Sequence, residues 1–139
     1  MRQTRVVSPA SELGSIRVVL ADDDRLFAQM MRAQLSLNSD LEVVGIASDG
    51  AEAVALAAEL EPDVVLMDVS MPNLDGIAAT RLIREMPVPP MVVLVTGDDE
   101  TTDARAYEIG AAAYVRKTGD FAALIDLIVA ISQFVVAVG

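Results

Sequence analysis

The stretch VVLMDVSMPNLDG, residues 64–76, decides how this chain folds. Its first four residues are apolar without interruption, which is typical of a strand that helices cover on both faces. Asp68 follows this run directly, at the end of what is expected to be a buried strand. Asp75 and Gly76 close the stretch and are typical of a turn that caps a helix. We therefore expect a buried strand that presents Asp68 at its carboxyl end, followed by a loop and a helix.

Short apolar runs alternate with longer amphipathic segments on both sides of this stretch. The runs predict strands at residues 16–20, 41–47, 64–67, 91–96 and 113–116. The amphipathic segments predict helices at residues 25–37, 51–60, 77–85, 102–109 and 121–138, and Asp49 can cap the second of them. Strict alternation implies right-handed crossovers and a parallel sheet between two layers of helices. The expected fold is α/β, a doubly wound (βα)5 domain over residues 16–139, preceded by a loosely ordered arm at residues 1–15.

Composition excludes several classes of function. Of the 139 residues 53% are hydrophobic, which indicates a globular domain, and 21 acids against 10 bases give a net charge of −11. Such a chain binds nucleic acid poorly by itself, because that surface needs clustered Lys and Arg. The absence of Cys and His excludes disulfides, thiolate or imidazole metal sites and a histidine base.

The amino-terminal segment does not have the pattern of a signal peptide. Residues 1–15 are polar and include Arg2 and Arg5, without an apolar central region. No uninterrupted apolar run approaches the about 20 residues that span a bilayer. We therefore expect a cytoplasmic protein that has no membrane partner.

Polar residues follow four of the predicted strands. Asp22-Asp23-Asp24 follows the first strand, Asp68 the third, Thr96 ends the fourth and Lys117 follows the fifth. Open α/β sheets bind ligands beyond the carboxyl ends of their strands. No glycine-rich phosphate loop follows the first strand, which argues against a dinucleotide or P-loop site. The predicted edge therefore carries acids, a hydroxyl and an ammonium group.

These side chains suit magnesium-dependent phosphoryl chemistry. Carboxylates that converge repel one another unless a cation lies among them, and oxygen ligands select Mg²⁺, Mn²⁺ or Ca²⁺. Asp68 is ionised at neutral pH and can form an acyl phosphate as a nucleophile. Thr96 and Lys117 can contact phosphoryl oxygens, and Lys117 is the single lysine among ten basic residues.

Taken together, the acid pair after the first strand, the Asp68–Gly76 motif, Thr96 and Lys117 resemble the receiver domain of two-component response regulators. The resemblance spans residues 16–138 and implies a flavodoxin-like strand order 2-1-3-4-5. It also implies that a sensor histidine kinase or a phosphotransfer protein donates a phosphoryl group to Asp68. Such a domain is not an enzyme in the ordinary sense, because it catalyses only its own phosphorylation and dephosphorylation.

The same resemblance implies a metal site. In the family Mg²⁺, for which Mn²⁺ can substitute, is held by positions that match Asp23, Asp68 and the backbone carbonyl of Ser70, with Asp22 acting through water. This sequence has three consecutive acids after the first predicted strand, whereas the family's metal site uses two. Counting from the apolar run assigns Asp22 and Asp23 to the metal and makes Asp24 the helix N-cap.

The family also assigns roles to three residues on the fourth and fifth strands. Thr96 and Lys117 match the residues that contact the phosphoryl group, and Tyr114 matches an aromatic switch whose rotamer follows the threonine. A Tyr114 that merely borders the core is an equal alternative. The implied output surface comprises the fourth helix, the fifth strand and the fifth helix.

The sequence departs from the family pattern in two places, and the first is the residue after Lys117. Thr118 stands where most receivers have proline, so we expect a trans Lys117–Thr118 peptide bond. Lysine without this proline resembles the subfamily whose receivers precede a helix-turn-helix DNA-binding domain. No such domain follows in this sequence, which suggests either a part of a longer protein or a stand-alone receiver.

The last predicted helix is the second departure, because it is apolar on more than one side. A core-facing stripe accounts for Leu124, Ile125, Ile128, Ile131 and Val135. The apolar residues left over, expected to point elsewhere, are Leu127, Val129, Phe134 and Val138. Exposed apolar patches usually mark an interface, so we expect a homodimer through this helix or packing against another domain.

Two other functions fit part of the pattern. A magnesium-dependent aspartyl-phosphate hydrolase of the haloacid dehalogenase type needs an acid two residues after its nucleophile, where this chain has Ser70. A binding module that works without phosphorylation, a pseudo-receiver, would not need the full set of Asp22, Asp23, Asp68, Thr96 and Lys117.

Overall fold

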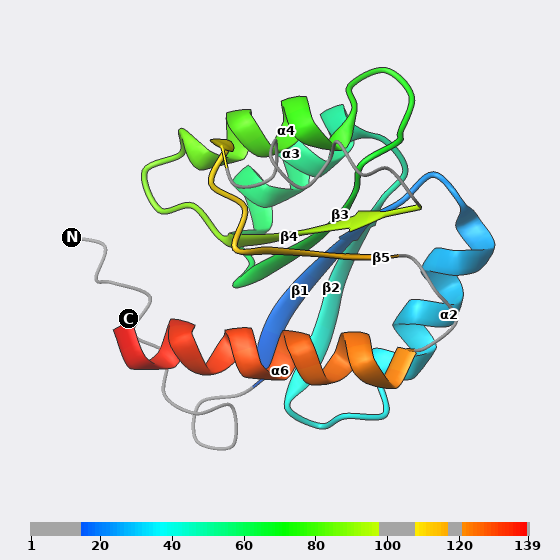
Figure 1. Ribbon diagram of the computed structural model, residues 1–139, viewed down its shortest axis with the longest axis vertical. Coiled ribbons are helices and arrows are strands. Elements are labelled where there is room, and N and C mark those ends of the chain that lie inside the picture. Colours follow the sequence, from blue (N-terminus) through cyan, green and yellow to red (C-terminus); the bar gives the residue numbers. More distant parts are fainter. Residues whose placement is uncertain (1–14, 98–107, 117–120, 139) are drawn as a thin grey trace.

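The computed structural model describes residues 15–97, 108–116 and 121–138, the last with side chains at 122–130 (Figure 1). The strands are β1 Ile16–Ala21, β2 Leu41–Ala47, β3 Val64–Asp68, β4 Met91–Thr96 and β5 Ala113–Arg116. The helices are α2 Arg25–Leu35, α3 Gly50–Leu60, α4 Gly76–Arg84 and α6 Phe121–Val138. All five predicted strands and four of the five predicted helices are confirmed, with ends that differ by at most two residues. The predicted helix at 102–109 lies mostly outside the described residues, as does the arm at 1–14.

The five strands form one parallel sheet in the order β2-β1-β3-β4-β5, as the resemblance implied. Helices α3 and α4 cover one face of the sheet, and α2 and α6 cover the other (Figure 1). Strand order reverses between β1 and β3, so the crevice expected of this fold opens where these two strands end. The residues that follow β1 and β3 are Asp22 and the loop after Asp68.

Strand β3 shows why the core has two halves. Its residues alternate between the faces of the sheet, as successive side chains of any strand do. Val65 and Met67 pack in the half under α3 and α4, whereas Val64 and Leu66 pack in the half under α2 and α6. All four are buried, which explains the uninterrupted apolar run in the sequence.

Helix α6 corrects one expectation. Leu124 and Ile128 are buried and Ile125 packs beside them, as the predicted stripe requires. Leu127 and Val129, however, are half-buried and pack against the same core half, so their prediction as outward-facing residues is wrong. The sheet face that α6 covers is wider than a single helical stripe. The side chains of Ile131, Phe134, Val135 and Val138 lie outside the described part, and the homodimer stays a prediction.

Aspartates begin three of the helices. Asp24, Asp49 and Asp75 are the N-caps of α2, α3 and α4, as their positions in the sequence predicted. Each side chain accepts a hydrogen bond from the backbone N–H three residues later, at 3.1, 2.8 and 2.8 Å respectively. These bonds satisfy donors that the first turn of a helix leaves free, so the three acids have a structural role.

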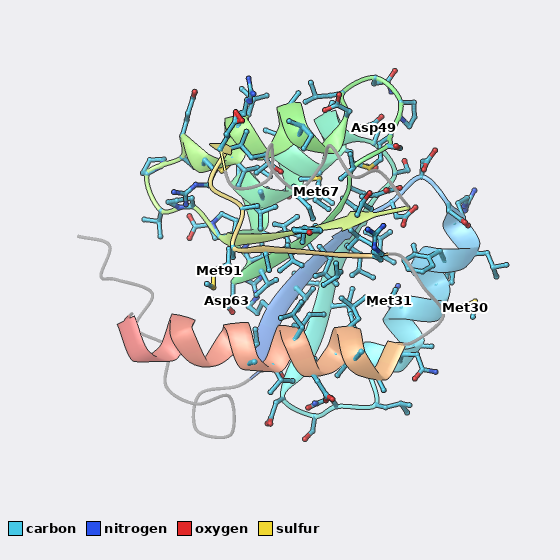
Figure 2. All side chains as sticks on the ribbon, viewed as in Figure 1. Met30, Met31, Asp49, Asp63, Met67 and Met91 are labelled. Atoms are coloured by element: carbon cyan, nitrogen blue, oxygen red, sulfur yellow. The ribbon has the colours of Figure 1, made fainter. Side chains whose placement is uncertain are left out.

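Asp63, a buried carboxylate at the amino-terminal end of β3, also has a structural role. Asp63 Oδ2 accepts a hydrogen bond from the Arg17 N–H at 2.9 Å. The Arg17 guanidinium in turn donates to the Leu60 carbonyl at 2.6 Å, where its positive charge complements the carboxyl end of α3. In Figure 2 Asp63, which directly precedes β3 in the chain, lies left of the centre, whereas Asp49 lies at the upper right. Asp63 is thus distinct from the acids that follow β1 and β3.

Candidate functional site

Three carboxylates converge at the carboxyl edge of the sheet. Asp22, Asp23 and Asp68, here called the acidic cluster, each have an oxygen within 4.8 Å of the other two. Asp22 is 6% exposed and Asp68 is 5% exposed, whereas Asp23 is open to solvent. The cluster therefore has two buried members at its base and one accessible member at its rim.

Asp22 is placed by the end of β1. Its N–H donates to the Ala47 carbonyl of β2 at 2.9 Å, which continues the sheet pairing by one residue. Its Oδ1 accepts the N–H of Asp24 at 2.8 Å, and Asp24 caps α2. The three consecutive acids thus separate into an inward residue, a solvent-facing residue and a helix cap. The cap role of Asp24 is confirmed, and the assignment of Asp22 and Asp23 to a metal stays a prediction.

Asp68 ends β3, and the segment that follows, residues 69–75, is here called the 69–75 loop. The Val69 N–H donates to the Val95 carbonyl of β4 at 3.0 Å, so the loop leaves the sheet still paired to its neighbour. The Ser70 N–H then donates to Asp68 Oδ1 at 3.3 Å, which turns the loop back over the carboxylate. The Ser70 N–H therefore lies directly beside the Asp68 carboxylate.

Gly76 closes this loop. Its N–H donates to the Val69 carbonyl at 2.9 Å, and a Cβ at this position would lie 2.1 Å from the Asp68 carbonyl oxygen. No side chain fits in that space. The glycine of the sequence motif is thus needed so that the first turn of α4 can approach the backbone of Asp68.

The other predicted site residues lie on β4 and β5. Thr96 is buried at the end of β4, one residue beyond the Asp68–Val95 strand pair, and pairs with Arg116 of β5. Tyr114 is half-buried on β5 and packs against the core half under α3 and α4. Lys117 and the Lys117–Thr118 peptide bond lie outside the described residues.

The base of the acidic cluster is apolar on one side. A small pocket is lined by Asp22 and Asp68 together with Phe27, Met31, Leu66, Val95 and Leu124. Met31 lies on the sheet side of α2, whereas Met30 points outward (Figure 2). Apolar walls solvate charge poorly, so they increase the cost of holding two carboxylates close together.

The donor set fits a hard divalent cation. It consists of the carboxylate oxygens of three aspartates, two of which are buried. Oxygen ligands at this spacing match the preference of Mg²⁺, and an accessible rim leaves room for the water or phosphoryl ligands that Mg²⁺ retains. A cation here would also remove the repulsion among the three carboxylates.

This repulsion predicts that Asp23→Asn changes the free energy of unfolding in opposite directions with and without Mg²⁺. In EDTA, Asp23→Asn is expected to raise the free energy of unfolding by about 1 kcal/mol, because one of three neighbouring charges is removed. In excess Mg²⁺ the variant is expected to be less stable than the parent, because metal binding stabilises the folded state of the parent. Urea denaturation in both buffers measures this.

Asp126→Asn serves as the control, because Asp126 is an exposed acid on α6 that is not a member of the cluster. It changes the net charge equally and should respond to Mg²⁺ as the parent does. Equal Mg²⁺ stabilisation of Asp23→Asn and the parent would contradict a metal site that includes Asp23.

Sequence reasoning missed one contact near the site. The Asn73 side chain in the 69–75 loop donates from Nδ2 to Asp49 Oδ2 at 2.7 Å, across 24 residues of sequence. Asp49 was recognisable as a helix cap, but nothing local indicated its second partner. The loop that follows Asp68 is thereby tied to the start of α3.

Within the residues that the structure describes, no helix has both the length and the apolar character needed to cross a bilayer.

Comparison with known proteins identifies similar chains. The model of the response regulator receiver domain family matches residues 18–129. The transcriptional regulatory protein LiaR of Bacillus subtilis is 44% identical over 119 residues, which cover 85% of this chain and 56% of LiaR. DegU of Brevibacillus brevis, also a transcriptional regulatory protein, is 37% identical over 119 residues, covering 85% of this chain and 50% of DegU. The chain thus spans about half the length of these relatives.

Solved structures show the same fold. The signal receiver domain of the putative response regulator NarL from Mycobacterium tuberculosis superposes with a TM-score of 0.81 at 32% identity, covering 86% of this chain and 97% of that domain. The response regulator domain of Thermotoga maritima CheB superposes with a TM-score of 0.78 at 30% identity, covering 90% and 98%.

Proposed function

Because this chain belongs to the response regulator receiver domain family of two-component systems, we propose that it takes up a phosphoryl group on Asp68 and acts as a phosphorylation-dependent switch. The donor is a sensor histidine kinase or a phosphotransfer protein, since receiver domains of response regulators interact with histidine kinases. The observation that carries the proposal is the convergence of Asp22, Asp23 and Asp68 within 4.8 Å at the strand-order reversal.

The proposed step is a transfer between two nucleophiles. A carboxylate oxygen of Asp68 attacks the phosphorus of phosphohistidine, so an O–P bond forms as the P–N bond breaks. The imidazole leaves with the electron pair of that bond and takes up a proton from solvent. The transition state is loose, so the protein contributes mainly position and charge stabilisation.

The surrounding residues of this chain have separate tasks in that step. Asp23, Asp68 and the Ser70 carbonyl are proposed to hold Mg²⁺, with Asp22 acting through water; when bound, the ion neutralises phosphoryl oxygens. Thr96 and Lys117 are proposed to hydrogen-bond the remaining phosphoryl oxygens. The Ser70 N–H orients the Asp68 carboxylate through its hydrogen bond to Oδ1.

The proposed output is a change in the conformation of one surface of the domain. Phosphorylation adds negative charge that draws Thr96 toward the site, and Tyr114 on the neighbouring strand responds. This shifts the population of conformations at the surface of β5 and α6. The transcriptional regulators among the relatives support a role in controlling gene expression. The chain is proposed to have no catalytic turnover beyond its own phosphorylation and dephosphorylation.

The test is uptake of phosphate from a small donor. After incubation with acetyl phosphate and Mg²⁺, intact-mass measurement is expected to find one added phosphoryl group, which hydroxylamine removes as it does other acyl phosphates. Excess EDTA is expected to prevent uptake. A folded sample that gains no phosphoryl mass would contradict the proposal and favour the phosphorylation-independent binding module.

A further inference from the structure

The 69–75 loop contains a backbone turn that needs outside support. The Leu74 N–H donates to the Pro72 carbonyl at 2.7 Å, and Asn73 between them has a φ of 67°. A bond across one residue with positive φ defines a γ-turn of the rare and strained kind. Such a turn persists only where its surroundings hold it in place.

Two residues at the start of α3 provide this support. Asp49 Oδ2 accepts the Asn73 side-chain N–H at 2.7 Å. At Gly50 an added Cβ would lie 1.9 Å from the Leu74 carbonyl oxygen, so the loop backbone rests directly against the helix. Asp49 is labelled near the upper edge of the molecule in Figure 2.

Asp49 accepts the bond from Asn73 in addition to its bond as the cap of α3. Its other oxygen, Oδ1, accepts the Glu52 N–H at 2.8 Å as the cap of α3, so each carboxylate oxygen has one partner. The bonds from Glu52 and Asn73 hold the pKa of Asp49 below its ordinary value. The carboxylate therefore stays ionised at neutral pH, and a bond to an ionised acceptor is stronger than a neutral one.

From these contacts we infer that Asp49 and Asn73 are positioning residues for the metal site: their hydrogen bond holds the 69–75 loop, whose Ser70 N–H donates to Asp68 and whose Ser70 carbonyl is the proposed magnesium ligand. This inference rests on the proposed function, because it takes Ser70 as a magnesium ligand. Neither residue touches the acidic cluster, so both act through the loop that joins Ser70 to Asn73.

The experiment measures Mg²⁺ binding by titration calorimetry on folded protein. Asp49→Ser keeps an N-cap for α3 but removes the bond to Asn73, since serine caps as well as aspartate. Asn73→Gly keeps the positive φ but also removes the bond. Each is expected to weaken Mg²⁺ binding about 2- to 10-fold, the range for loss of one hydrogen bond. The double variant is expected to bind no more weakly than the weaker single variant.

Asp75→Ser is the matched control, because it removes the same charge from another helix N-cap and leaves the Asn73 bond intact. This variant corrects for long-range electrostatics. Its Mg²⁺ affinity should lie within about twofold of that of the parent, as expected for a charge outside the site. Circular dichroism confirms that every variant is folded at the temperature used.

Equal Mg²⁺ affinities of Asp49→Ser, Asn73→Gly and Asp75→Ser would overturn the inference while leaving the proposed function intact. Additive losses in the double variant would also overturn it, because independent effects do not come from one shared bond. A parent protein that binds no Mg²⁺ would instead overturn the proposed metal site itself, and the inference with it.

Discussion

Asp68→Asn is expected to take up no phosphoryl group from acetyl phosphate under conditions that phosphorylate the parent protein. The amide lacks the negative charge and the nucleophilic oxygen that an acyl phosphate requires. The substitution nearly preserves shape, and the new side-chain carbonyl can still accept the Ser70 N–H bond that Asp68 Oδ1 accepts at 3.3 Å. Loss of uptake would therefore report on chemistry rather than on folding.

Asp75→Asn is the matched control for this variant. Asp75 lies in the same segment, and asparagine caps helices as well as aspartate, so the bond to the Ala78 N–H is retained. Its phosphoryl uptake is expected to equal that of the parent, as measured by intact mass over time. Uptake by Asp68→Asn at the parental rate would place the acceptor at another acid and contradict the proposed role of Asp68.

Gly76→Ala is expected to destabilise the protein by about 3 kcal/mol, the upper part of the range for overpacking. Inside a helix, replacing glycine by alanine usually stabilises the protein by about 1 kcal/mol. Here the same replacement is expected to destabilise it. The reason is that the added Cβ would lie 2.1 Å from the Asp68 carbonyl oxygen and 3.0 Å from the Met67 side chain. Both belong to a buried strand that cannot move aside easily.

The comparison variant is Gly97→Ala, because an added Cβ at Gly97 meets no atom of the described residues within 4 Å. Its free energy of unfolding is expected to stay within about 0.5 kcal/mol of the parent, as for most surface substitutions. Urea denaturation of both variants in the same buffer measures the difference. If Gly76→Ala were as stable as Gly97→Ala, α4 would not approach the Asp68 backbone as closely as described.

Features that depend on neighbours in the sequence were predictable. The buried strand β3 follows from an apolar run, and the caps at Asp24, Asp49 and Asp75 follow from bonds that span three residues. In each case the deciding interaction lies within a few residues of the pattern that reveals it.

Features that depend on distant segments were not predictable in the same way. The burial of Leu127 and Val129 depends on the width of the sheet face beneath α6, which the helix sequence does not contain. The link between Asn73 and Asp49 joins residues 24 positions apart, and neither residue type implies the other. Such contacts arise only when two crossover units pack side by side.

Residue identities along the chain therefore predict which elements form, where the acids lie and which of them begin helices. The alternation of apolar runs and helices, the turn residues and the caps all act over short range, where residue identity sets the free energy directly. The tertiary structure decided how close Asp22, Asp23 and Asp68 come, and that α3 supports the loop after Asp68. These distances follow from the packing of parallel strands and helices against one another, which is a property of the whole sheet rather than of any one segment.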